Sequence, residues 1–143
     1  MIEKYFNKNL DDVARIEKLS FNNPWPIYQF KNYSMNLIFS MSYIYKIGNK
    51  VVGYLMGQVI LNVVHIQNIA VEKNQRNKSI AKEMIFHLID ESKKKNINKL
   101  CLEVNSSNIF ALKLYNSIGF YKTGEKKEYY EDGKDAILMD FVI

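Results

Sequence analysis

The pattern of apolar positions changes its period along the chain, starting with a helical repeat near the amino terminus. Apolar residues recur at three-residue steps from Leu10 to Leu19, which is typical of one buried face of a helix, and Asn9 precedes them as a possible cap. The sequence Pro24-Trp25-Pro26 interrupts this pattern. A short second helix is expected after it, through Tyr33.

Runs rich in β-branched residues then predict strands. Residues 39–47 and 51–60 flank a Gly-Asn-Lys turn and predict a hairpin, and a third strand is expected over residues 63–71. Residues 51–71 contain no Asp, Glu, Lys or Arg, and this length raises the question of a membrane span. Their β-branched and interspersed polar residues favour two buried strands, joined near Leu61-Asn62.

The second half of the chain alternates between helical and strand patterns. In order, it predicts a helix, a strand, a short helix that ends at Gly119, and two strands, over residues 79–95, 100–104, 108–117, 120–130 and 135–142. A strand-helix-strand passage implies a parallel crossover, whereas hairpins imply antiparallel pairs. We therefore predict an α/β fold with a mixed, mostly antiparallel sheet of six to seven strands and about four helices.

Composition narrows the class of protein. The chain has 143 residues, 48% of them hydrophobic, which suits a single domain over residues 1–143. The lone cysteine, Cys101, excludes an intramolecular disulfide, and the first residues lack the apolar core of an export signal, so a cytoplasmic monomer is expected. The net charge of +5 comes mostly from scattered lysines, which are typical of a solvated surface. Neither nucleic-acid binding nor membrane association is expected.

Metal chemistry is not expected either. His65 and His87 are far apart in the sequence and have no neighbouring ligand pattern. Cys101 has no candidate base beside it in the sequence, and we interpret it as a residue that fills the core.

The turn after residue 71 carries the most specific chemistry. One of only two arginines, Arg76, stands here beside Lys78, directly before an apolar helix. The first amide groups of a helix are unpaired and carry partial positive charge, so this turn suits a pyrophosphate. A solvated loop of ordinary composition explains the same residues.

The spacing Arg76-x-x-Ser79-x-Ala81 resembles the acyl-CoA pyrophosphate loop of the GCN5-related N-acetyltransferase (GNAT) family. The order of the surrounding segments matches as well, with Asn68-Ile69-Ala70-Val71 before the loop and Leu102-Glu103-Val104, Asn108 and residues 111–120 after it. This resemblance spans nearly the whole chain. It implies the GNAT fold, in which two central parallel strands, here residues 63–71 and 100–104, splay apart to admit acetyl-CoA.

The resemblance also implies which residues bind acetyl-CoA. They are Ile69, Ala70, Val71, Arg76, Asn77, Lys78, Ser79, Ile80, Ala81, Lys82 and Asn108. Ser79 departs from the family, where glycine is usual because it lets the backbone approach phosphate. Serine is small and its hydroxyl could donate to a phosphate oxygen. Asn108 could alternatively serve only as a helix cap.

Two residues are candidates for catalysis. Glu103 interrupts an apolar strand, which on pattern alone fits a strand end facing water or a functional base. The resemblance implies that it is the general base. Tyr115 matches the family tyrosine that protonates the departing CoA thiolate, although it could instead be a tyrosine packed by its ring.

Within the family, the chain most resembles bacterial enzymes that acetylate the N-terminal alanine of ribosomal protein S18. The residues that carry this likeness are Phe21, Pro24-Trp25, Glu128-Tyr129-Tyr130 and Asp135-Ala136-Ile137-Leu138-Met139. The resemblance implies that the acceptor is a protein N-terminus that enters between residues 21–33 and 129–135. The alternatives are a GNAT enzyme that acetylates a small amine or a lysine side chain, and a CoA-binding module without catalysis.

Overall fold

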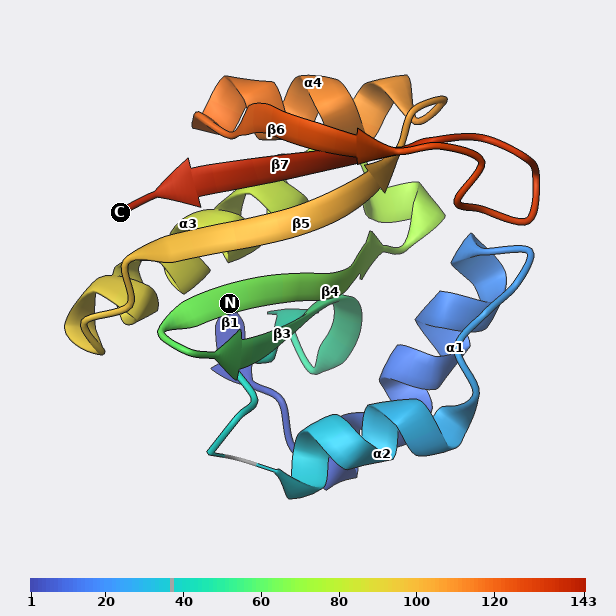
Figure 1. Cartoon of the computed structure of the whole chain (residues 1–143). Coiled ribbons are helices and arrows are strands. Elements are labelled where there is room, and N and C mark those ends of the chain that lie inside the picture. Colours follow the sequence, from blue (N-terminus) through green and yellow to red (C-terminus); the bar gives the residue numbers. More distant parts are fainter. Residues whose placement is uncertain (37) are drawn as a thin grey trace.

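The computed structural model describes residues 1–36 and 38–143. In this described part, seven strands form one mixed sheet in the order β1-β2-β3-β4-β5-β7-β6 (Figure 1). The strands are β1 (Ile2–Lys4), β2 (Tyr43–Ile47), β3 (Lys50–Ile60), β4 (Val63–Val71), β5 (Lys99–Asn105), β6 (Tyr121–Lys126) and β7 (Ala136–Val142). The helices are α1 (Leu10–Ser20), α2 (Ile27–Met35), α3 (Ile80–Lys94) and α4 (Ile109–Ile118), with the 3-10 turns η1 (Asn7–Asn9) and η2 (Lys73–Gln75). The predicted mixed sheet is confirmed.

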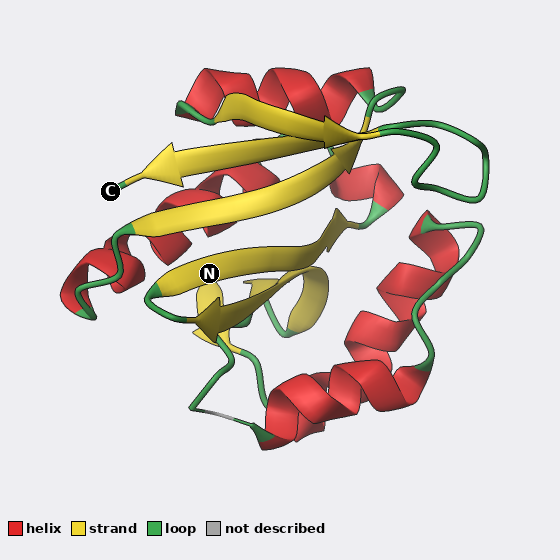
Figure 2. Ribbon diagram, in the orientation of Figure 1, coloured by secondary structure: helices red, strands yellow, loops and turns green. Residues whose placement is uncertain are grey.

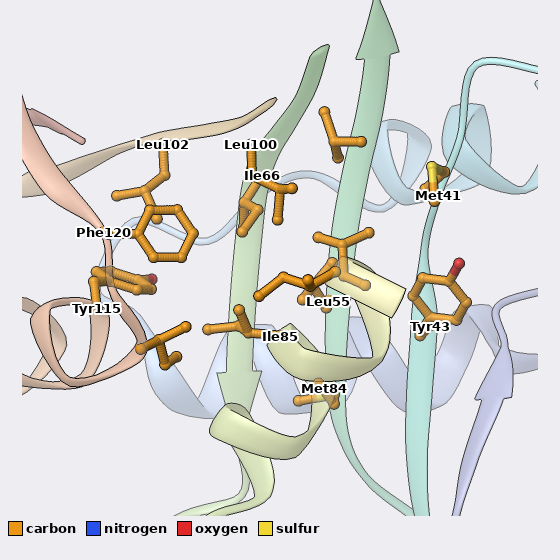
Figure 3. Close-up of a cluster of buried hydrophobic side chains, with 14 of the residues drawn as sticks. Met41, Tyr43, Leu55, Ile66, Met84, Ile85, Leu100, Leu102, Tyr115 and Phe120 are labelled. Carbon is orange, nitrogen blue, oxygen red and sulfur yellow. The ribbon is translucent and has the colours of Figure 1, made fainter. Parts of the chain in front are cut away.

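Helices cover both faces of the sheet, with α3 and α4 on one side and α1 and α2 on the other (Figure 2). Strand β3 contributes side chains to the hydrophobic clusters on both faces of the sheet, because successive side chains of a strand point to opposite faces. Leu55 packs in the larger cluster with Leu100 and with Met84 of α3 (Figure 3). Its neighbours Tyr54 and Met56 pack with α1 and α2. The apolar run of β3 is therefore buried on both faces.

The two central parallel strands pair over only part of their length. Their register runs from Val63 opposite Lys99 to Ile66 opposite Leu102 and stops there. Beyond this point β4 keeps pairing with β3, and β5 keeps pairing with β7, so the two halves of the sheet diverge (Figure 1). A register shift between β3 and β4 leaves Gln67 as an extra residue, and such a bulge bends its strand. The predicted splay is confirmed.

The apolar run over residues 51–71 forms the β3–β4 hairpin. Leu61 and Asn62 make its turn, and both have positive φ angles, 49° and 63°. No helix in the described ranges is both long and apolar enough to cross a membrane. The prediction of two strands is therefore confirmed.

The structure contains one strand that the sequence analysis did not predict, and it differs from two local predictions. Strand β1 has three residues, too few to show any period in the sequence, and forms by pairing with β2. Strand β2 begins at Tyr43 rather than at residue 39, since Ser40 makes only an isolated bridge to Gln58. Asn9 does not cap α1 through its side chain, because its Oδ1 accepts the N–H of Phe6 at 3.0 Å.

The carboxy-terminal hairpin also differs, because its loop is longer than predicted. Strand β6 ends at Lys126 rather than near residue 130, and β7 starts at Ala136. The carboxylate of Asp135 accepts the backbone N–H of Glu128 at 2.9 Å, and Glu128 has a positive φ of 48°. This side-chain bond replaces the strand pairing that the sequence pattern predicted.

A buried carboxylate on α1 joins the amino-terminal helices to the centre of the sheet. Glu17 is only 2% exposed. It accepts hydrogen bonds from the Tyr54 hydroxyl on β3, from Asn68 Nδ2 on β4 at 2.7 and 2.9 Å, and from the Trp25 N–H at 3.1 Å. A buried charge is tolerated when donors surround it in this way. Glu17 therefore fixes the loop before α2 against the diverging part of β4.

Replacing Glu17 should destabilise the fold strongly. Glu17→Ala leaves buried donors on three elements without an acceptor, and we expect the free energy of unfolding to fall by about 3 kcal/mol. Urea denaturation measures this change. The matched control is Lys18→Ala on the exposed side of the same helix, which should change stability by less than about 0.5 kcal/mol. A loss below about 1 kcal/mol for Glu17→Ala would contradict this role.

Candidate active site

A cavity of about 740 Å³ lies over β4, β5 and β7. Its lining residues on the strands include His65, Gln67, Cys101, Glu103 and Asp140. Trp25 and Gln29 line it from the segment around the start of α2, and Tyr129 and Tyr130 from the β6–β7 hairpin. The structure thus brings together, around one cavity, the two segments between which the sequence analysis expects an acceptor.

Glu103 lies at the mouth of the gap between the splayed strands. It is the first residue of β5 beyond the segment paired with β4. Its neighbours Leu102 and Val104 are buried in the core beside α3 and α4, so alternation directs Glu103 to the opposite face, where it lines the cavity. Its side chain is 35% exposed, and its Oε1 accepts a hydrogen bond from Lys126 Nζ at 2.7 Å.

Tyr115 lies on the other face of β5. It is 6% exposed and packs against Phe120 with a ring separation of 5.6 Å (Figure 3). Burial, with a smaller contribution from Tyr130, raises the pKa of Tyr115 to about 12. Glu103 lines the cavity, whereas Tyr115 does not and belongs to the buried core on the other side of the sheet.

Tyr130 belongs to this site, and the sequence analysis did not single it out as a site residue. It lines the cavity from the hairpin. Burial raises its pKa to about 12, and the negative charge of Glu103 is the next cause. Tyr130 is also the second cause, after burial, of the raised pKa of Tyr115. Its position depends on the long hairpin loop, which local patterns did not predict.

Backbone groups on β4 face the gap at alternate residues. The N–H of Glu72 donates to the carbonyl of Val52 at 2.8 Å, so antiparallel alternation directs the backbone of Ala70 toward β3 and that of Ile69 and Val71 toward the gap. Arg76 Nε donates to the Val71 carbonyl at 2.9 Å. Of the three β4 residues expected to pair with the cofactor, Ala70 therefore has its amide and carbonyl turned away.

The turn before α3 presents polar backbone at the carboxyl end of β4. The N–H of Glu83 donates to the Ser79 carbonyl at 2.9 Å, which leaves the three preceding amides, of Ile80, Ala81 and Lys82, without intrahelical acceptors. The positive end of the α3 dipole lies at the same place. Asn77, Lys78 and Ser79 are exposed around it. Unpaired amides and a positive helix end of this kind favour an anion.

Ser79 has a left-handed backbone conformation, with φ of 62°. Asn77 shares this conformation with φ of 63°, but asparagine tolerates it better than serine does. Glycine adopts such angles without strain, which gives a backbone reason for glycine at this position of the loop. Asn108 caps α4 by accepting the Ala111 N–H at 3.2 Å, so its alternative role as a cap is realised.

Cys101 was wrongly interpreted as a core residue. It is half-buried, lines the cavity and lies 3.0 Å from His65 Nδ1 on the neighbouring strand. Burial raises the pKa of the Cys101 thiol and lowers that of the His65 imidazole, which favours the neutral pair. The two residues are 36 positions apart in the sequence, so only strand pairing reveals the contact. Within the described ranges, no three His, Cys, Asp or Glu side chains are grouped to hold a metal ion.

This fold and site define a class of enzyme. The model of the acetyltransferase (GNAT) family matches residues 10–120. The chain belongs to this family and is an N-acetyltransferase. An uncharacterised N-acetyltransferase of Methanocaldococcus jannaschii is 33% identical to it over 140 residues, which are 97% of this chain and 89% of that protein.

Within the family, the chain is similar to ribosomal-protein-alanine N-acetyltransferases. The ribosomal protein bS18-alanine N-acetyltransferase of Escherichia coli K12 is 37% identical over 93 residues, 63% of each protein. The crystal structure of the ribosomal-protein-S18-alanine N-acetyltransferase from Escherichia coli aligns with a TM-score of 0.93 and 29% identity. This alignment covers 100% of this chain and 93% of that one.

The strain at Ser79 and its hydroxyl can be separated by two substitutions. Ser79→Gly should stabilise the fold by about 1 kcal/mol, because glycine adopts positive φ without strain. Ser79→Ala keeps the strain but removes the hydroxyl. Thermal unfolding measures stability, and calorimetry measures the Kd of acetyl-CoA. If the hydroxyl contacts phosphate, both variants bind more weakly than wild type; equal or tighter binding by both excludes that contact.

Proposed function

We propose that this protein transfers the acetyl group of acetyl-CoA to the N-terminal alanine of a protein like ribosomal protein bS18. The observation that supports this proposal is that the pairing of β4 with β5 ends just before Glu103, which lines a cavity between the two segments expected to flank the acceptor. Similarity to the bS18-alanine enzymes supports the choice of acceptor. Such an acceptor would place the reaction in the cytoplasm, and we expect the enzyme to act as a monomer.

The cofactor would lie along the open edge of β4. The amide-bearing pantetheine arm can pair with the backbone of Ile69 and Val71, whose groups face the gap. Ala70 would contribute only through its position between them. The pyrophosphate would bind at the start of α3, where amides and cations gather, through Arg76, Asn77, Lys78, Ser79, Ile80, Ala81 and Lys82. Asn108 would border the same ligand from the start of α4.

Each catalytic group has one task in the proposed reaction. Glu103, directly or through water, takes a proton from the acceptor ammonium so that the amine can attack the thioester carbonyl. The N–H of Val71 faces the carbonyl oxygen and stabilises the negative charge that develops there. Tyr115 gives its proton to the CoA sulfur as the bond from carbon to sulfur breaks, and the attacking nitrogen loses its second proton to water. Proton exchange with solvent then returns Glu103 and Tyr115 to their starting forms. The amide product and the CoA thiol then leave.

The energetics favour an α-amine as acceptor. At pH 7, deprotonation takes about 1.4 kcal/mol for an α-amine of pKa near 8 and about 4.6 kcal/mol for a lysine of pKa near 10.4. A single glutamate that is one third exposed suits the easier task. Small amines and lysine side chains are the alternative acceptors. A module that only binds CoA would require neither Glu103 nor Tyr115 beside the gap.

The acidic residues of the β6–β7 hairpin differ in whether they are available to bind an acceptor. Asp135 accepts the Glu128 N–H and pairs with Lys127 at 3.3 Å, so it stabilises the loop and is not free for a ligand. Asp132 likewise holds Lys134 and Asn105. Glu131 is exposed and is the better partner for a basic side chain of the acceptor.

A panel of acceptors tests the proposed substrate. Release of the CoA thiol from acetyl-CoA should be fastest with a peptide that begins Ala-Arg. An N-terminally blocked peptide with one lysine, and a polyamine, should react at least tenfold more slowly, because their amines are harder to deprotonate. Faster reaction with either of these would overturn the alanine assignment. No reaction with any amine would favour a CoA-binding module.

Substitution of the two catalytic residues tests the mechanism. Glu103→Gln and Tyr115→Phe should each lower kcat by roughly 10² to 10⁴, while the Kd of acetyl-CoA stays within about threefold. The control Tyr121→Phe alters an exposed tyrosine outside the cavity and should leave kcat unchanged. A kcat within a few-fold of wild type for either catalytic variant rejects its role.

The alkaline side of the pH profile tests Tyr115 further. Its pKa in the folded protein is raised from 10.0 to about 12, so the neutral phenol is favoured. The acid form and the stability linked to it are therefore complete below pH 10 and are lost as the pH rises through 12. We expect no alkaline decline in kcat from Tyr115 below pH 10. A decline near pH 8 that is absent from Tyr115→Phe would contradict this expectation.

A further inference from the structure

A lysine side chain is paired with the carboxylate of Glu103, the proposed base for the acceptor amine. Lys126, at the end of β6, places its Nζ 2.7 Å from Glu103 Oε1. The same Nζ lies 4.9 Å from the centre of the Tyr129 ring. Glu103 and Tyr129 both line the cavity. The ammonium of Lys126 therefore stands where an acceptor ammonium would approach its base.

We propose that Lys126 is a competing cation that an acceptor ammonium must displace from Glu103, and that it thereby sets the selectivity of the site for acceptor charge. This inference rests on the proposed role of Glu103. Two ammonium groups on one carboxylate repel each other at close range. Binding of a cationic acceptor consequently requires that Lys126 move away.

The contact is suited to displacement. The Lys126 side chain is 46% exposed and that of Glu103 is 35% exposed, and ion pairs of such exposure are weak. The Tyr129 ring, whose centre is already 4.9 Å from the ammonium, can keep a favourable contact with it after it leaves Glu103. Lys126 can thus leave Glu103 while it stays beside the hairpin. A neutral acceptor amine meets no such competition.

The other ionisable groups near Glu103 do not replace Lys126 as a cation. They are His65 on β4, Cys101 on β5 and Tyr130 in the hairpin. Burial lowers the pKa of His65 and raises those of Cys101 and Tyr130, so all three are neutral near pH 7. The hydrogen bond to Glu103 raises the pKa of Lys126 above its usual 10.5, and the lysine stays charged at pH 9. Lys99 and Asp140 also line the cavity, but they pair with each other at 3.2 Å, so Lys126 is the cation that pairs with Glu103.

Binding of a peptide that begins Ala-Arg to the CoA-loaded protein tests the proposal by calorimetry. At pH 7, Lys126→Met should bind this peptide about threefold to fivefold more tightly than wild type, as expected for loss of a weak exposed pair. Lys126→Arg keeps the charge and should restore the wild-type Kd. Lys122→Met is the matched control, because Lys122 lies on the same strand but pairs with Glu125 outside the cavity, and it should change nothing.

Two further arms separate charge competition from a structural effect. At pH 9 most of the α-amine, with pKa near 8, is neutral, so the gain from Lys126→Met should disappear. In a Glu103→Gln background, Lys126→Met should have no effect, because the contested charge is gone. The Kd of acetyl-CoA should be the same in all variants.

The outcomes for the inference and for the proposed function are distinguishable. Three results would overturn the role of Lys126: unchanged or weaker peptide binding by Lys126→Met at pH 7, a gain in binding that persists at pH 9, or no measurable peptide binding. Acetyl transfer by the wild-type enzyme is measured separately by thiol release. An enzyme that binds the peptide as expected but does not acetylate it would overturn the proposed function and leave the charge competition established.

Discussion

The separation of β4 from β5 is the constraint on which the rest of this structure depends. The strands pair only as far as Ile66 and Leu102, and then each follows its other neighbour. The bulge at Gln67 bends β4, and the Glu17 carboxylate holds Asn68 directly after it. The divergence leaves backbone groups of β4 without strand partners. An extended ligand that carries amides is the natural partner for such groups, which is why the proposed acyl-CoA site depends on this one irregularity in pairing.

Three carboxylates near the sheet differ in how strongly they are paired, and this difference separates two structural residues from the proposed base. Glu17 is surrounded by donors and joins α1 to the sheet. Glu72, 8% exposed, pairs with Arg15 and with Lys50 at 3.3 Å, and so fixes the start of the loop that precedes α3. Glu103 has one exposed partner, Lys126, and open space beside it. A carboxylate that is weakly paired and next to a cavity is the one able to exchange partners during a reaction.

Both arginines of the chain are also bound to other protein groups, near the end of β4. Arg15 pairs with Glu72, and Arg76 binds the carbonyl of Val71 through Nε. Both therefore stabilise the end of β4 and the loop after it. The planar guanidinium suits such positions, because it can bind a backbone or carboxylate oxygen on one edge and present further donors on another. The many lysines of the chain, by contrast, are flexible point charges at the surface.

The amino-acid sequence alone determined the periodic part of the fold. Helices α1 and α3, the β3–β4 hairpin and strand β5 follow from repeats of apolar residues that are local, and the family pattern placed Glu103, Tyr115 and the loop from Arg76 to Ala81. Only the tertiary structure determined the features that depend on contacts between segments distant in the sequence. Strand β1 exists only through its pairing with β2, Cys101 meets His65 across two strands, and Lys126 reaches Glu103 from another strand. The local repeat of apolar residues predicts which face of a helix or strand a side chain occupies. It cannot predict which side chains lie opposite on that face, because these belong to segments that are distant in the sequence.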